Sequence, residues 1–132
     1  MNSNIIQWNC RGLRSNFEEL SLICTKHKPS VIALQETFLQ QSSKVSLSGF
    51  NVVHVGSTSS RPHGGVAIFI KKDILFSNVE LDTTLSAIAV RVSLHRTITI
   101  CNIYLSPSER ISRSDVVHLI DQLPTPFLLV VD

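Results

Sequence analysis

The sequence lacks the residue patterns that mark several common classes of protein. Its three cysteines, Cys10, Cys24 and Cys101, include no Cys-x-x-Cys pair, so neither a disulfide framework nor a cysteine zinc site is indicated. The five histidines form no His-x-x-x-His or His-Glu-x-x-His pattern, which argues against a zinc enzyme. No glycine-rich phosphate loop of the Gly-x-Gly-x-x-Gly or Walker type is present, so the sequence does not support a nucleotide cofactor.

Charged residues and long apolar runs are scarce as well. Charged residues make up 17% of the 132 positions and the formal net charge is +2, which permits nucleic-acid binding without requiring it. Hydrophobic residues make up 43%, in runs too short to span a bilayer, and the first residues lead directly into a strand pattern without a secretory signal. We therefore expect an intracellular protein with no membrane segment and a single α/β domain over residues 1–132.

What the sequence does contain is a set of short apolar runs that each end on a polar residue. The runs at residues 5–8, 31–35, 98–103 and 127–131 stop at Asn9, Glu36, Tyr104 and Asp132, respectively. Short apolar runs bounded by polar turns predict buried strands. Ligands of open α/β sheets bind outside the carboxyl ends of such strands, so the four polar residues predict one common site.

The elements around these runs predict a mixed α/β fold. Residues 17–27 carry apolar side chains at helical spacing and end before Pro29, with Ser15 and Glu18 as an expected capping box. With the flanking runs they form a β-α-β unit over residues 4–36, which implies two parallel strands. The remaining pattern predicts a surface loop at 37–49, strands at 50–55, 66–70, 88–94, 97–104 and 127–131, and a helix capped by Ser112 or Ser114.

Each of the four polar residues suits phosphate or metal chemistry. Glu36 is the best candidate ligand for Mg²⁺, which is commonly held by one or two protein carboxylates and by substrate phosphate oxygens. Asn9 can bind a phosphate oxygen or a metal-bound water without adding negative charge. Tyr104 can stabilise an oxyanion, and Asp132 can orient an attacking water or supply a second carboxylate. Taken singly, Glu36 also fits a helix cap, Asn9 a turn and Tyr104 ordinary packing.

The turn-rich connection at residues 56–65 supplies two further candidates. Arg61 and His63 are candidate phosphate contacts, with solvated loop charges as the alternative. The adjacent pair Gly64-Gly65 is expected to satisfy a backbone requirement before the next strand.

Five short segments carry a resemblance to a known family. They are Ile-Ile-Gln-Trp-Asn-Cys-Arg-Gly-Leu at 5–13, Ile-Ala-Leu-Gln-Glu-Thr at 32–37, His-Gly-Gly-Val-Ala-Ile at 63–68, Asn-Ile-Tyr at 102–104 with Pro107, and Leu-Leu-Val-Val-Asp at 128–132. In this order they resemble the endonuclease/exonuclease/phosphatase superfamily. More narrowly, they are similar to the apurinic-type endonuclease domain at the N-terminus of non-LTR (LINE, jockey-like) retrotransposon polyproteins.

The resemblance implies a fold, a site and an activity. The fold would be roughly the first half of a four-layer α/β sandwich of the DNase I-like type, with flanking helices. Asn9 and Glu36 would help hold Mg²⁺ or Mn²⁺, Tyr104 would meet the scissile phosphate, and Asp132 would align the nucleophile. The implied reaction is nicking of a DNA strand in the nucleus. It would leave a 3′-hydroxyl from which the reverse-transcriptase region of the same polyprotein primes.

The sequence also departs from the family pattern. Val131 occupies the position of the glycine that precedes the family's aspartate, and neither the following Phe-Asn nor the Ser-Asp-His segment with the catalytic histidine is present. We therefore expect an N-terminal fragment that is inactive on its own. Two alternatives remain: a phosphoesterase of the same fold acting on another substrate, such as a phosphoinositide, or a non-catalytic remnant that binds nucleic acid.

Overall fold

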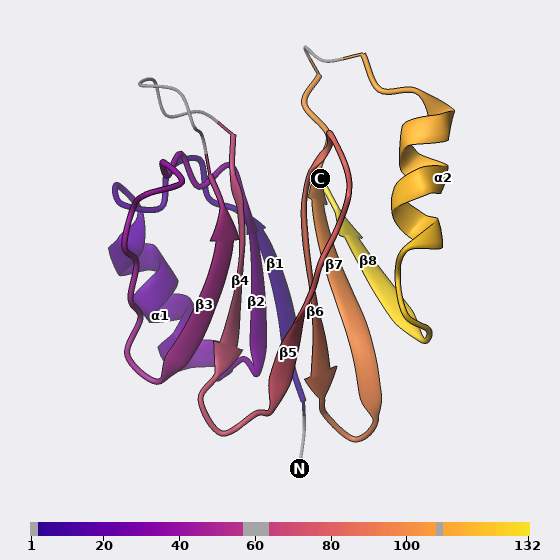
Figure 1. Ribbon diagram of the computed structural model, residues 1–132. Helices are drawn as coiled ribbons and strands as arrows, with labels where there is room; N and C mark the ends of the chain where they lie inside the picture. Colours follow the sequence, from indigo (N-terminus) through magenta and orange to yellow (C-terminus); the bar gives the residue numbers. More distant parts are fainter. Residues whose placement is uncertain (1–2, 57–63, 108–109) are drawn as a thin grey trace.

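Eight strands and two helices follow one another in the part of the chain that the computed structural model describes, residues 3–56, 64–107 and 110–132 (Figure 1). In chain order they are β1 (Ile5–Asn9), α1 (Phe17–His27), β2 (Val31–Gln35), β3 (Phe50–Val55), β4 (Val66–Lys71), β5 (Phe76–Val79), β6 (Ser86–Ser93), β7 (Thr97–Tyr104), α2 (Arg113–Asp121) and β8 (Phe127–Val131). Neither of these helices is long and apolar enough to cross a membrane.

The strands form two four-stranded sheets that face each other. The first sheet has the order β1-β2-β4-β3 and the second the order β5-β6-β7-β8. The pairs β1–β2 and β7–β8 are parallel and the other neighbours are antiparallel, so both sheets are mixed. Helix α1 covers the outer face of the first sheet and α2 the outer face of the second, which gives four layers (Figure 1). The predicted parallel pair at residues 4–36 and the mixed α/β class are confirmed.

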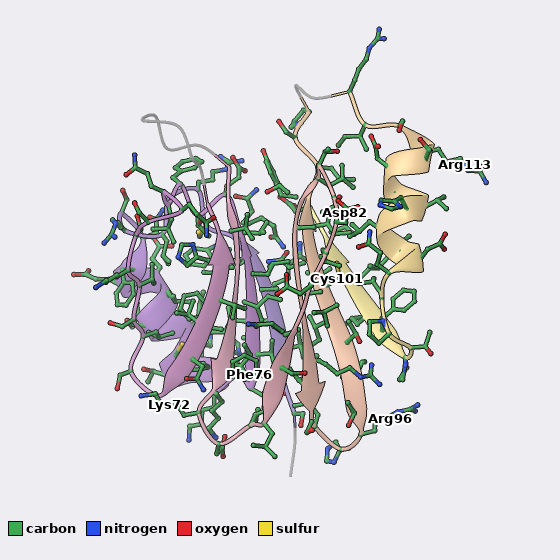
Figure 2. The ribbon with its side chains drawn as sticks, in the orientation of Figure 1. Lys72, Phe76, Asp82, Arg96, Cys101 and Arg113 are labelled. Carbon is green, nitrogen blue, oxygen red and sulfur yellow. The ribbon has the colours of Figure 1, made fainter. Side chains whose placement is uncertain are left out.

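Three apolar layers hold the sandwich together, one between the sheets and one beneath each helix. Successive residues of a strand point to opposite faces of its sheet. In β2, Val31 and Ala33 face the second sheet, whereas Ile32 and Leu34 face α1, so every residue of this strand is buried. Figure 2 shows side chains filling these layers, with the charged groups of Lys72, Arg96 and Arg113 at the periphery.

One local expectation is wrong and one strand was not expected. The capping box of Ser15 and Glu18 does not form, because α1 begins one residue after Asn16 and the Asn16 side chain makes no cap hydrogen bond. Instead, the Asn16 amide nitrogen donates to the carbonyl oxygens of Cys10 at 2.7 Å and Gly12 at 3.1 Å, which fixes the loop after β1. The sequence also gave no sign of β5, an edge strand with only two apolar residues. For α2, Ser112 is the cap, accepting from the backbone N–H of Asp115.

Candidate active site

The four predicted site residues lie at the carboxyl ends of four strands, two in each sheet. Asn9 ends β1 and Glu36 follows β2, while Tyr104 ends β7 and Asp132 follows β8. Each of these strand pairs is parallel, so the paired ends lie at one edge of their sheet. The Gln7 side-chain nitrogen donates to the carbonyl oxygen of Val131 at 3.2 Å, which brings the two edges together. We call the group Asn9, Glu36, Tyr104 and Asp132 the rim cluster.

Asn9 joins the two carboxylates of the rim cluster. Its amide nitrogen donates to Asp132 Oδ2 at 2.5 Å and also to Glu36 Oε2. Its Oδ1 accepts from the backbone N–H of Arg11 at 3.3 Å, so both ends of the amide have partners of the correct kind. Glu36 and Asp132 are 96 positions apart in the sequence, yet both carboxylates contact one nitrogen atom.

Tyr104 completes the cluster. Burial raises the pKa of its phenol, and the negative charges of Glu36 and Asp132 raise the pKa further. The phenol also donates a hydrogen bond to Glu36, which favours the neutral form, whereas a hydrogen bond with Ser106 acts in the opposite direction. The neutral phenol can donate a hydrogen bond to an oxygen atom of a bound ester.

The backbone around Glu36 is held in a conformation that side chains seldom adopt. Glu36 has φ +53° and Phe38 has φ +57°, and such left-handed residues cost about 1–3 kcal/mol each. Hydrogen bonds on both sides offset this cost: the Glu36 carbonyl accepts from Gly12 at 2.8 Å, and the Phe38 N–H donates to Gly64 at 2.8 Å. The loop after β2 is therefore clamped between the loop after β1 and the segment that leads into β4.

The two carboxylates of the rim cluster fit a hard divalent cation. Among the described residues, the ion pairs are Lys71–Asp73 and His118–Asp82, and neither involves the cluster. Two like charges held close together without a basic partner favour a bound cation, and their oxygen atoms are the ligand type that Mg²⁺ and Mn²⁺ prefer. The residues that the structure describes include no group of three or more His, Cys, Asp or Glu suited to a metal. A cation bound by Glu36 and Asp132 would therefore keep waters or phosphate oxygens as its other ligands.

Asn9 is oriented as a donor in this arrangement. Its N–H₂ group faces Glu36 and Asp132, and its oxygen is taken by Arg11. Coordination of a metal through Asn9 Oδ1, as the family resemblance implies, requires the amide to turn over. The other two candidates, Arg61 and His63, lie outside the described residues.

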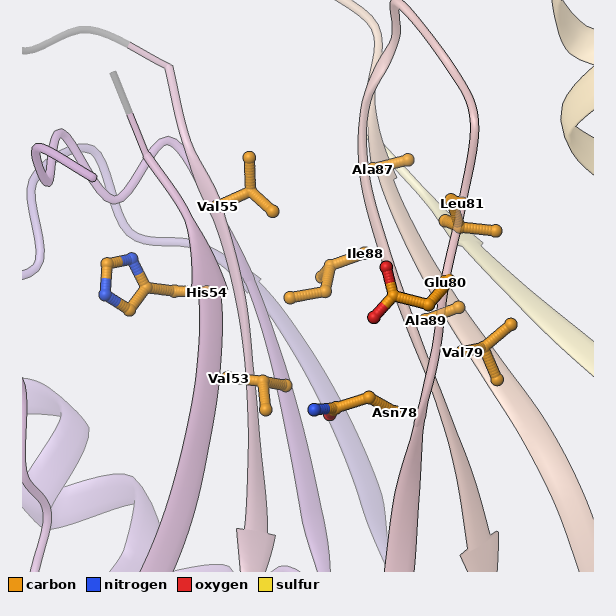
Figure 3. Close-up of a pocket in the computed structure, with 10 residues that line it drawn as sticks. All are labelled: Val53, His54, Val55, Asn78, Val79, Glu80, Leu81, Ala87, Ile88 and Ala89. Carbon is orange, nitrogen blue, oxygen red and sulfur yellow. The ribbon is translucent and has the colours of Figure 1, made fainter. Parts of the chain in front are cut away.

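A separate hollow between the sheets does not contain the rim cluster. It has a volume of about 380 Å³ and lies at the β3–β5 side of the sandwich (Figure 3). Glu80 is the one carboxylate among its lining residues, and the ring of His54 is turned away from it (Figure 3). The hollow therefore offers no rival cation site.

Sequence reasoning missed two polar residues next to the cluster, Gln35 and Asn102. Both are fully buried, although each belongs to a strand whose pattern is otherwise apolar. A buried side-chain amide must find hydrogen-bond partners. An amide within a strand that is otherwise apolar could therefore have indicated a buried polar contact from the sequence alone.

The Glu36→Gln substitution is expected to lower the pKa of Tyr104. It removes one of the two negative charges that raise this pKa, while an acceptor remains for the phenol. Because Tyr104 is the single tyrosine of the chain, an ultraviolet absorbance titration measures its ionisation directly. Glu18→Gln on the exposed surface of α1 should leave the titration unchanged. An unshifted curve in Glu36→Gln would contradict the contact between the two side chains.

Comparison with known proteins places this geometry in a family. The model of the Endonuclease/Exonuclease/phosphatase family matches residues 6–129. The RNA-directed DNA polymerase from mobile element jockey of Drosophila melanogaster is 29% identical over 124 residues, which are 92% of this chain and 14% of that protein. The jockey polymerase of Drosophila funebris is 25% identical over the same length.

A solved structure shows the same fold. The endonuclease domain of TRAS1, a telomere-specific non-LTR retrotransposon, matches with a TM-score of 0.74 at 16% identity and covers 99% of this chain and 58% of that domain. The expected class, part of a DNase I-like sandwich with two facing mixed sheets, is confirmed. So is the resemblance to retrotransposon proteins. Because the family match extends over nearly the whole sequence, the chain belongs to the endonuclease/exonuclease/phosphatase family.

Proposed function

We propose that the rim cluster is part of the active site of a divalent-cation-dependent DNA endonuclease from a retrotransposon. The observation that carries this proposal is the convergence of Glu36 and Asp132 on the Asn9 amide, with Tyr104 close enough for both negative charges to raise the pKa of its phenol. Residues from the ends of two sheets meet there with two uncompensated negative charges and two hydrogen-bond donors. That combination suits an anionic ester that binds together with a cation.

The residues have distinct roles in this proposal. Glu36 is the main cation ligand, and Asp132 aligns the attacking water or supplies a second carboxylate. In the structure the Asn9 N–H groups donate to the two carboxylates. When a cation takes those carboxylates, the N–H groups of Asn9 and the O–H group of Tyr104 become available to donate to the phosphoryl oxygens, where negative charge increases during in-line attack. The bound Mg²⁺ or Mn²⁺ would supply neutralisation of the phosphoryl charge.

DNA is the proposed substrate and partner. The chain spans 14% of the jockey polymerase and 58% of the TRAS1 domain, so the activity of a whole protein is inferred here from relatives. Further support comes from Danio rerio TDP2, solved with a single-strand DNA product, which matches with a TM-score of 0.63 at 18% identity and covers 98% of this chain and 58% of that one. The proposed nick supplies a 3′-hydroxyl in the nucleus, from which the reverse-transcriptase region of the same polyprotein primes.

For these 132 residues on their own, we expect binding without turnover. The family resemblance assigns the general base to a histidine, and none of the four described histidines lies at the rim. His27 ends α1, His54 bonds to the carbonyl of Ser43, His95 lies between β6 and β7, and His118 lies on α2.

Two assays on the 132-residue chain test the proposal. Fluorescence anisotropy of a labelled DNA duplex should show binding that Mg²⁺ strengthens and that Glu36→Ala makes independent of Mg²⁺. Supercoiled plasmid should stay intact, and nicking that disappears in Glu36→Ala would overturn the expected inactivity but support the site. Binding with a steep salt dependence and no response to Mg²⁺ or to Glu36→Ala would instead indicate a nucleic-acid-binding remnant. Preferential binding of phosphoinositide over DNA would indicate another phosphoesterase.

A further inference from the structure

Three side-chain amides form a continuous chain beneath the rim cluster. Gln35, the last residue of β2, donates from Nε2 to Asn102 Oδ1 of β7 at 2.6 Å. Gln7 of β1 donates from Nε2 to Gln35 Oε1 at 3.4 Å. The side chains of Gln35 and Asn102 are completely buried, whereas Gln7 is exposed at the edge. We call these three residues the amide chain.

Backbone carbonyl groups at both ends fix the direction of the amide chain. Asn102 Nδ2 donates to the carbonyl oxygens of Leu34 and Ala67, each at 2.9 Å, and Gln7 Nε2 donates to the carbonyl oxygen of Val131 at 3.2 Å. Because a carbonyl oxygen can only accept, the Asn102 nitrogen must face the carbonyl groups of Leu34 and Ala67, which leaves its oxygen to accept from Gln35. Each amide therefore has a single orientation that satisfies its neighbours.

The amide chain crosses the space between the sheets twice. Asn102 reaches from the second sheet to β2 and β4 of the first, and Gln7 reaches from the first sheet to β8 of the second. The core cluster of that layer is apolar, and apolar contact has no directional preference, so it does not by itself select one alignment of two facing sheets. Hydrogen bonds in a dry interior do select one, because any other alignment leaves buried amides unpaired.

The three residues of the amide chain, and Val131 at its exposed end, each lie one or two positions before a member of the rim cluster. Gln7 precedes Asn9 by two positions and Gln35 directly precedes Glu36. Asn102 precedes Tyr104 by two positions, and Val131, whose carbonyl accepts from Gln7, directly precedes Asp132.

We propose that Gln35 and Asn102 are positioning residues for the rim cluster. Their paired amides align the strand ends that carry Asn9 and Glu36 with those that carry Tyr104 and Asp132. The alignment lets carboxylates from two sheets share one cation. This inference rests on the proposed function for what the cluster binds, whereas the alignment itself can be measured in the absence of any cation.

The deciding variant is the double substitution Gln35→Met with Asn102→Leu. Each single substitution leaves one buried amide group without its partner and should lower the urea concentration at the unfolding midpoint. The double substitution removes both partners of the Gln35–Asn102 hydrogen bond and fills the space with apolar groups. It also removes the donor to the carbonyl oxygens of Leu34 and Ala67, a loss that it shares with the single Asn102→Leu variant, but it leaves no amide of the pair unpaired. We expect the double variant to unfold closer to the wild-type midpoint than Asn102→Leu alone, yet to bind Mn²⁺ about ten- to a hundred-fold more weakly than the wild type.

Two readouts separate positioning from a merely structural role. Quenching of the single tryptophan, Trp8, measures Mn²⁺ affinity, since Trp8 directly precedes Asn9. The side-chain amide resonances of Asn9, followed by NMR without a cation, report its hydrogen bonds to Glu36 and Asp132 and should move toward those of a solvated asparagine. Val90→Ala, in the same layer but outside the amide chain, should lower stability without changing either readout.

The outcomes distinguish this inference from the proposed function. If the double variant keeps wild-type Asn9 resonances, the positioning role is wrong, whatever the protein binds. If the wild type binds neither Mn²⁺ nor Mg²⁺ but the resonances shift in the double variant, the alignment role is supported and the proposed function fails. Weaker Mn²⁺ binding together with shifted resonances supports both.

Discussion

Replacing Glu36 with glutamine is expected to weaken the binding of Mn²⁺ and Mg²⁺ by roughly ten- to a thousand-fold. A unit charge 4 Å from another contributes about 1 kcal/mol in water and about 4 kcal/mol near a protein surface, and the divalent charge increases the effect. Each 1.4 kcal/mol corresponds to about a factor of ten in affinity. Glutamine retains the size of the side chain and an oxygen that can accept from Asn9 and Tyr104, so the fold should persist.

Trp8 makes this measurement direct, because quenching by Mn²⁺ reports binding close to Asn9 and Mg²⁺ can be titrated as a competitor. Glu18→Gln, an equal loss of charge on the exposed surface of α1, is the matched control and should leave both affinities unchanged. Equal affinities in wild type and Glu36→Gln would place the cation elsewhere and end the metal assignment.

The position of the rim cluster could be predicted from sequence because it depends on local patterns. Where an apolar run ends is visible in the sequence, and parallel strands place their ends at one edge. The proximity of Asn9 and Glu36 follows from the β-α-β unit alone. Tyr104 and Asp132 required one more step, namely that the second sheet faces the first with its parallel pair at the same edge.

Contacts between the sheets could not be predicted in the same way. Gln35 and Asn102 are 67 positions apart, and no periodicity indicates that they face each other.

The start of α1 was predicted incorrectly for a local reason. The Asn16 amide donates to carbonyl groups of the loop after β1 and makes no hydrogen bond to the first turn of α1. Competition between two sets of backbone partners is decided by the folded loop and not by a cap motif.

Gly65→Ala is expected to destabilise the fold by about 2–5 kcal/mol and also to weaken cation binding. Gly65 has φ +89°, and an added Cβ atom would lie 2.5 Å from Thr37 Oγ1. Thr37 is buried, directly follows Glu36 and donates its N–H to the Gly65 carbonyl oxygen at 3.3 Å. Relieving the overlap therefore moves Thr37, and with it the backbone that holds the Glu36 side chain in the rim cluster.

Gly49→Ala supplies a matched control, because Gly49 has φ +85° and no atom lies within 4 Å of the added Cβ position. It carries nearly the same backbone strain, about 1–2 kcal/mol, without the collision, and should leave Mn²⁺ affinity unchanged. Thr37→Ala removes the colliding atom and should restore part of the stability lost in Gly65→Ala, a coupling that a double-mutant cycle in urea measures. Equal losses in Gly65→Ala and Gly49→Ala would show that strain alone is responsible. Additive effects of Gly65→Ala and Thr37→Ala on the free energy of unfolding would show that the contact between the added Cβ atom and Thr37 Oγ1 is not the cause of the lost stability.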